Sequence, residues 1–254
     1  MHQGGPGLAG HNKWSQIKRK KAANDNQRGK IISKHIRAIQ SAVREGGGGD
    51  PSSNLALKNA LGAAKADDVP ADNIDRAIER GLGSAEGGTF EAVAYEGYGP
   101  SGVAFLVEAL TDNRNRTVAE VRHVFTKHGG NMSGSTAWQF DAVGLLVVPS
   151  SEEALQEVAI DQGALDLEVD EDGSMTITTP PTELYRIADA LAEAGAEAEV
   201  AQLTKVAQTK AAVSSADAAK IVRMMDALED LDDVQHVYST ADLEAAEAVS
   251  GGVL

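Results

Sequence analysis

The spacing of hydrophobic residues changes once along this 254-residue chain, close to residue 89. Before that point, apolar residues recur every three to four positions, which is typical of amphipathic helices. After it, short alternating or continuous apolar runs are typical of strands, and they alternate with further helical segments. The chain is therefore predicted to have a helical N-terminal part followed by a mixed part of helices and strands.

The N-terminal part is predicted to form three short helices in a small bundle. The first spans about 29–45 and buries one stripe of apolar residues, which consists of Ile32, Ile36, Ile39 and Val43. The second spans about 53–65. In the third, Pro70 suits the first helical turn and Gly81 lies past the end.

The remainder is predicted to hold two ferredoxin-like units, one of them interrupted by the other. Strands are expected at 91–98, 102–110, 131–140, 144–148, 165–169, 174–178, 198–204 and 233–238, and helices at 117–128, 151–162, 181–194 and 215–228. From 143 to 204 the order is βαββαβ, a ferredoxin-like unit. The β-α-β segment before it and the α-β segment after it can together complete a second unit.

These patterns predict an α+β fold with three domains: an N-terminal three-helix bundle followed by two ferredoxin-like α/β domains, one inserted in the other. Residues 1–86 would form a basic arm and the helical bundle, with 1–8 as a flexible leader. Residues 87–141 and 205–254 would form one α/β domain, and 142–204 an inserted acidic domain.

Charge is distributed unevenly along the chain, which has a net charge of −15. Residues 1–50 carry +7, residues 51–140 carry −3 and residues 141–254 carry −19. An acidic total argues against a nucleic-acid partner, but such asymmetry between the ends indicates a basic nucleic-acid-binding arm. The alternative interpretation is that the basic run is only a solvated face.

Several function classes are excluded or left without support. The chain has no cysteine, so disulfides, thiolate metal sites and cysteine nucleophiles are excluded. It shows neither a GxxxxGK[ST] phosphate loop nor a GxSxG nucleophile elbow. His123 and His128 are misaligned for zinc, and the acidic run from Glu168 has Thr179 where a calcium loop needs glutamate. We expect no enzyme activity, no cofactor, no metal, no membrane partner and a cytoplasmic location.

Two sequence features remain as candidate binding sites. The first is the arm from Lys13 to Lys21, whose cations can neutralise phosphates. It is continued by a basic face of the first helix, which includes Lys30, Lys34 and Arg37 and lies opposite the apolar stripe. Trp14 either stacks on an unpaired base or anchors the arm in a core.

The second feature is the segment Thr111–Thr117, between a strand and a helix. Its polar residues can cap the helix. Arg114 and Arg116 oppose the helix dipole unless an anion or a carboxylate receives them. The segment therefore indicates either a phosphate site or a domain-interface salt bridge.

At these residues the sequence resembles the YebC/PmpR family, whose mitochondrial relative is a translational activator of cytochrome c oxidase. The matching signatures are Ala9–Trp14, Arg28–Lys30, Gly47–Pro51, Val69–Ile74, Tyr95–Pro100, Thr111–Thr117 and Asp232–Gln235. The resemblance covers about 9–240 and implies three domains and a non-enzymatic regulator of gene expression.

The resemblance leaves the partner open. It implies a DNA-binding transcriptional regulator, with a translation factor that binds ribosomal RNA on stalled ribosomes as the alternative. A third possibility is an acidic protein-interaction scaffold. The predicted nucleic-acid-binding residues are Lys13, Trp14, Lys18, Arg19, Lys20, Lys21, Arg28, Lys30, Lys34, Arg37, Arg114 and Arg116.

Overall fold

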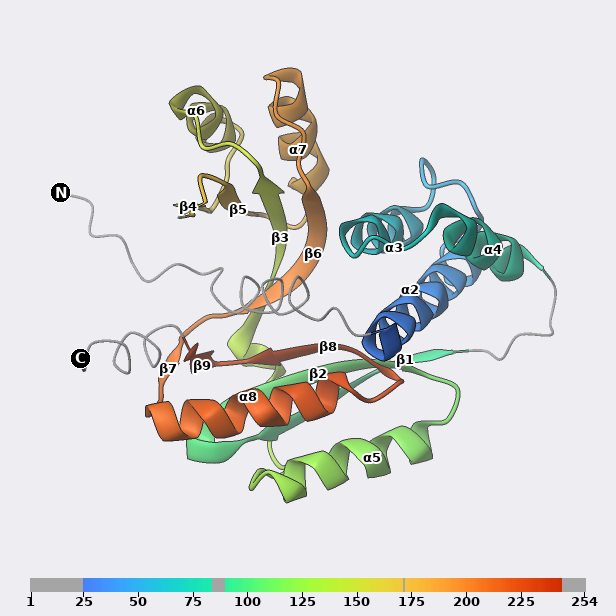
Figure 1. Ribbon diagram of the computed structural model, residues 1–254, viewed down its shortest axis with the longest axis vertical. Helices are drawn as coiled ribbons and strands as arrows, with labels where there is room; N and C mark the ends of the chain where they lie inside the picture. The colour runs from blue at the N-terminus through green and yellow to red at the C-terminus, as the bar shows by residue number, and fades with distance from the viewer. Residues whose placement is uncertain (1–24, 84–89, 171, 244–254) are drawn as a thin grey trace. The chain divides into compact units, whose positions relative to one another are not determined.

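A computed structural model of the chain describes residues 25–83, 90–170 and 172–243 (Figure 1). The chain divides into two compact units, one made of 1–83 with 142–206 and the other of 84–141 with 207–254. Helices and antiparallel strands occur in both units, so the predicted α+β fold class is confirmed. The boundaries expected for three separate domains stay a prediction.

The helical part consists of α2 (Asp25–Glu45), α3 (Leu55–Ala66) and α4 (Ala71–Leu82). The three helices share one apolar core, which includes Ile39, Val43, Leu57, Ala64, Ile74 and Ala77. The predicted stripe on α2 therefore faces this core, and α2 begins one turn earlier than the sequence predicted.

Gly81 lies inside α4 and not past its end, so that prediction was wrong. Gly81 is buried where α4 crosses α2, and a Cβ atom at this position would lie 2.7 Å from the Cβ of Val43. The glycine therefore marks a close helix crossing, and α4 instead ends at Leu82, with Gly83 as its C-cap. Pro70 is the N-cap residue, directly before the first turn of α4.

Asn54 joins the end of α2 to the start of α3. Its Oδ1 accepts a hydrogen bond from the N–H of Leu57 at 3.0 Å, which caps α3. Its Nδ2 donates to the carbonyl oxygens of Ala42 at 2.9 Å and Gly48 at 2.8 Å. One buried side chain thus fixes the glycine-rich turn between the two helices.

The segment 142–206 holds the predicted βαββαβ order, in β3 (Phe140–Val148), α6 (Glu153–Asp161), β4 (Asp166–Val169), β5 (Met175–Thr179), α7 (Leu184–Glu193) and β6 (Val200–Ala207). The strand order in the sheet is β4-β5-β3-β6. Leu146 and Ile177 from the sheet pack with Leu155 of α6 and Ile187 of α7 in one core. This segment also contacts α3, since the Tyr185 hydroxyl donates to Oδ1 of Asn59 at 2.6 Å.

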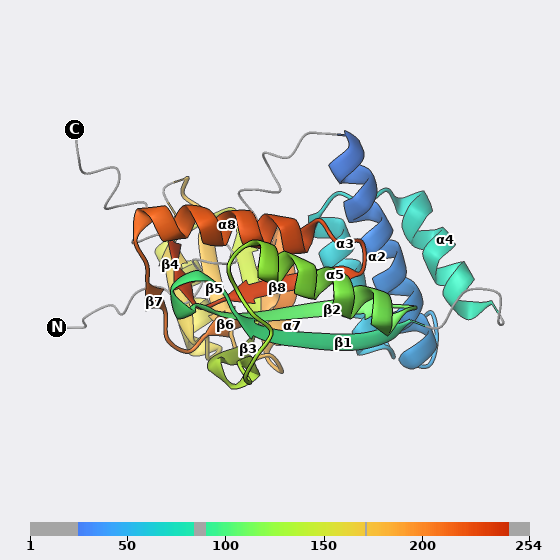
Figure 2. The same ribbon diagram turned by 90° about the horizontal axis from the view of Figure 1, so that it is seen from below.

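The second unit contains β1 (Glu91–Tyr98), β2 (Ala104–Thr111), α5 (Arg114–Lys127), α8 (Ser215–Glu229) and β8 (Val234–Ser239). The antiparallel sheet has the order β1-β2-β8, and α5 and α8 cover the same face of it (Figure 2). Phe105 of β2 and Phe125 of α5 meet edge to face beneath them, with ring centroids 5.9 Å apart. Two short strands, β7 (Ala211–Ala212) and β9 (Ala241–Asp242), pair in parallel.

The strand predicted at 131–140 was wrong. Asn131 forms an isolated bridge with Tyr98, and a 3-10 turn, η2 (Ala137–Gln139), precedes β3. The carboxylate of Glu96 accepts hydrogen bonds from the N–H groups of Thr136 and Ala137, the latter at 2.7 Å. Because a side chain satisfies these backbone donors, the segment does not need a neighbouring strand.

Candidate nucleic-acid interface

Six of the predicted binding residues lie outside the residues that the structure describes. They are the residues of the basic arm, namely Lys13, Trp14, Lys18, Arg19, Lys20 and Lys21. The other six lie in α2 and in the first turn of α5.

Helix α2 carries four of them. Arg28 and Lys30 are exposed, and Lys34 and Arg37 are half-buried. The core side of the same helix holds Ile39, which is fully buried. An α-helix turns by about 100° per residue, so Lys30, Lys34 and Arg37 share one side of α2, away from the core stripe.

His35 fixes which side of α2 faces α3. Its Nε2 lies 2.7 Å from Oδ2 of Asp67, the residue that follows α3. Residues 35 and 37 point about 100° to either side of Ile36. Arg37 therefore lies on the side of α2 away from α3.

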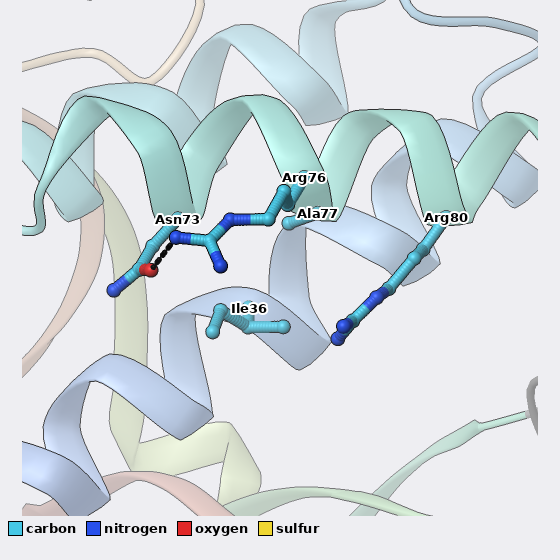
Figure 3. A pocket seen from close by; sticks show the side chains of 5 residues that line it. All are labelled: Ile36, Asn73, Arg76, Ala77 and Arg80. Carbon is cyan, nitrogen blue, oxygen red and sulfur yellow. Dashed lines mark hydrogen bonds between the residues drawn. The ribbon is translucent and has the colours of Figure 1, made fainter.

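The packing of α4 against α2 adds two cations that the sequence analysis did not single out. Arg76 and Arg80 of α4 line a shallow hollow of about 50 Å³ together with Ile36 of α2 (Figure 3). Asn73 and Ala77 complete its lining. The i, i+4 spacing of the two arginines was visible in the sequence, but the contact with α2 was not.

Arg114 and Arg116 lie in the first turn of α5, whose cap is Asn113. The side-chain oxygen of Asn113 accepts a hydrogen bond from the N–H of Arg116 at 3.1 Å. Nη1 of Arg114 lies 3.2 Å from Oε1 of Glu91. Nη2 of Arg116 lies 2.9 Å from Oδ1 of Asp112. Both guanidiniums thus already contact carboxylates of their own unit.

The main partner of Arg116 is Asp233, whose carboxylate is only 3% exposed. Oδ2 of Asp233 accepts hydrogen bonds from Nη2 of Arg116 at 2.6 Å and from the hydroxyls of Thr111 at 3.0 Å and Thr117 at 2.7 Å. Burial raises the pKa of Asp233, but these hydrogen bonds outweigh burial and hold the pKa below its ordinary value. Hydrogen bonding to Asp233 also raises the pKa of Arg116.

This geometry assigns the two arginines a structural task. They compensate for their unfavourable position at a helix N-terminus by pairing with Glu91, Asp112 and Asp233. A contact of Arg114 or Arg116 with nucleic acid stays a prediction.

Within residues 25–83, 90–170 and 172–243, no group of three or more histidine, aspartate or glutamate side chains is arranged to hold a metal ion. No helix in these ranges is long and apolar enough to cross a membrane.

Two family models match the chain. Residues 12–84 match the TACO1/YebC protein N-terminal domain, and residues 90–241 match the TACO1/YebC second and third domain. The chain belongs to the TACO1/YebC family. The resemblance seen in the sequence motifs is confirmed, and the first match ends where the helical part of the structure ends.

Similar members of the TACO1/YebC family include a protein of Thermus thermophilus that is 54% identical over 94% of this chain and 99% of its own length. A protein of Deinococcus radiodurans is 53% identical over the same shares. Both are named "probable transcriptional regulatory protein". The crystal structure of a conserved hypothetical protein from Aquifex aeolicus is also similar, with 45% identity, a TM-score of 0.76, and coverage of 86% of this chain and 91% of that one.

Proposed function

We propose that this protein is a non-enzymatic regulator of gene expression that binds nucleic acid through its N-terminal part. The main support is the basic side of α2, because Lys30, Lys34 and Arg37 add further positive charge to that of the preceding arm. Lysine and arginine neutralise phosphates and release counterions, which gives affinity without reading sequence. The names of the similar family members also support a regulatory role.

DNA is the first candidate partner, since both similar bacterial proteins are named as transcriptional regulators. Ribosomal RNA is the second candidate. A major-groove reader presents an array of asparagine, glutamine and arginine to base edges, whereas this side of α2 offers cations suited to phosphates. Phosphate contacts serve structured or single-stranded RNA equally well. For either partner we expect the protein to act in the cytoplasm.

The proposal is tested by crosslinking the protein to nucleic acid in cells and sequencing what is bound. The test variant replaces Lys18, Arg19, Lys20 and Lys21 with glutamate. The matched control replaces four exposed cations of α5 and α8 with glutamate, which changes the net charge equally; these are Arg122, Lys127, Lys220 and Arg223.

Loss of crosslinks in the arm variant alone supports the proposal. Equal crosslinking by wild type and both variants contradicts it and favours the protein-interaction scaffold. Recovered promoter DNA that survives competitor RNA identifies a transcriptional regulator. A translation factor is identified if ribosomal RNA is recovered and if the protein co-sediments with ribosomes but no longer does so when residues 1–30 are deleted.

A further inference from the structure

The seam between α2 and α4 forms a basic hollow on the helical part of the chain. Arg80 extends from α4 toward α2, and Arg76 runs along α4 to Asn73; both line the hollow with Ile36 of α2 (Figure 3). Ile36 and Ala77 contribute the apolar part of its lining. At about 50 Å³ the hollow is far smaller than the ~300–1,000 Å³ of ordinary small-molecule sites. It has room for a few ligand oxygens and not for a nucleoside.

The two guanidiniums differ in how they are held. Nε of Arg76 donates to the carbonyl oxygen of Asp72 at 2.9 Å, and Nη2 donates to Oδ1 of Asn73 at 3.1 Å. These bonds hold Arg76 in place. Arg80 makes no hydrogen bond or ion pair with any residue that the structure describes, so its five donors remain available to a ligand.

Three carboxylates lie near these arginines along α4. At about 100° per residue, Asp72, Asp75 and Glu79 fall on the outer side of Arg76, whereas Arg80 falls on its inner side, toward the core. An anion that approaches α4 from outside is therefore repelled, and one that enters along the seam meets both guanidiniums.

The hollow continues the basic side of α2. Arg37 lies about 100° around the helix from Ile36, on the side away from α3. Lys30 points in nearly the same direction as Arg37, two turns earlier. The basic side of α2 thus lies about 100° around the helix from Ile36, the residue of α2 that lines the hollow.

We propose that Arg76 and Arg80 bind a backbone phosphate of the nucleic acid in the seam between α2 and α4. This inference rests on the proposed function and adds a fixed contact point to it. Guanidinium groups bind phosphate oxygens through paired, charge-assisted hydrogen bonds, and two of them one helical turn apart can share one phosphate. Such a contact sets the orientation of α4 on the bound strand and carries no sequence information.

The test measures the affinity of the full chain for a labelled random-sequence DNA duplex and for a labelled single-stranded RNA over a range of salt concentrations. The variant Arg80→Gln is compared with Lys65→Gln. Both residues are exposed cations in the last turn of a helix in the same part of the chain. Thermal unfolding of each variant verifies that it is folded.

For the probe that the wild type binds, we expect Arg80→Gln to weaken the affinity about three- to tenfold and to lower the slope of log K against log salt by about one. Arg76→Gln should act similarly. Lys65→Gln should bind like the wild type. If the wild type binds either probe and Arg80→Gln matches Lys65→Gln, the seam is not a phosphate site, although the proposed function stands. If the wild type binds neither probe at low salt, both proposals fail.

Discussion

Nη2 of Arg116 lies 2.6 Å from Oδ2 of Asp233, although 117 residues separate the two in the chain. Between them the chain leaves the second unit after residue 141 and returns to it at residue 207. The contact therefore joins the start of α5 to the residue before β8 and closes the unit across the interruption. Thr111 and Thr117 donate to the same oxygen, so Asp233 is the centre of this closure.

Replacing Asp233 with asparagine should lower the free energy of unfolding by about 2–4 kcal/mol, because it removes a buried charge that three donors require. Urea unfolding measures the change. The control is Asp112→Asn, since Asp112 pairs with the same arginine but is half exposed. It should cost less than about 1 kcal/mol. Equal losses in the two variants would contradict a central role for Asp233.

The stability that Asp233 provides should depend on pH. Its hydrogen-bond donors hold the pKa in the folded state below the ordinary value of 3.8, despite burial, which raises it. A depressed carboxyl pKa stabilises the fold above the unfolded pKa, and this contribution is lost as the pH falls through the folded pKa. The difference in unfolding free energy between wild type and Asp233→Asn should be constant near neutral pH and shrink below 3.8. A difference that grows on acidification would refute this assignment.

Two glycines in helices should respond to alanine in opposite directions. Gly29 in α2 has open space around it, so Gly29→Ala should stabilise the protein by about 0.5–1 kcal/mol through helix propensity. In Gly81→Ala the added Cβ would lie 2.7 Å from the Cβ of Val43, so the helices must move apart, at a cost of about 1–3 kcal/mol. Thermal unfolding compares the two variants. A stabilising Gly81→Ala would show that the helices do not cross closely.

Glu96 should control the order of the segment before β3. Its carboxylate accepts from the N–H groups of Ala137 and Thr136 and from the hydroxyl of Ser135, and the hydrogen bond from Ala137 is the main cause of its lowered pKa. In Glu96→Ala, amide hydrogen exchange at Thr136 and Ala137 should accelerate by about tenfold or more, since one lost hydrogen bond is worth ~1–2 kcal/mol.

The control for that measurement is Glu120→Ala, an exposed glutamate on α5. It should leave exchange at Thr136 and Ala137 unchanged. Equal exchange rates in wild type and Glu96→Ala would mean that the turn holds its shape without the carboxylate.

Much of the fold was predictable because its signals are local. The apolar stripe of α2 and the βαββαβ order of 142–206 follow from periodicity within short windows. The contacts that escaped prediction are long-range. Glu96 accepts the hydrogen bonds of Thr136 and Ala137, which lie 40 and 41 positions later in the chain, in place of a neighbouring strand. The close contact with Val43 requires a glycine at position 81.

The candidate site shows the same division. The cations of α2 were predicted from their spacing along one helix. Arg76 and Arg80 were missed because their relevance depends on how α4 packs against Ile36. From the sequence, the partner of the Arg116 guanidinium could be either a bound anion or a carboxylate of the chain. Only the fold shows that Asp233 lies beside it.

The proposed role of the basic side of α2 is to hold the phosphates of a nucleic acid. It is tested most directly by the salt dependence of binding for the wild type and for a variant in which Lys30, Lys34 and Arg37 are all glutamine. We expect the affinity for random-sequence DNA or RNA to fall at least about tenfold in the variant, and the slope of log K against log salt to decrease by about two to three. Affinity and slope equal to those of the wild type would contradict it.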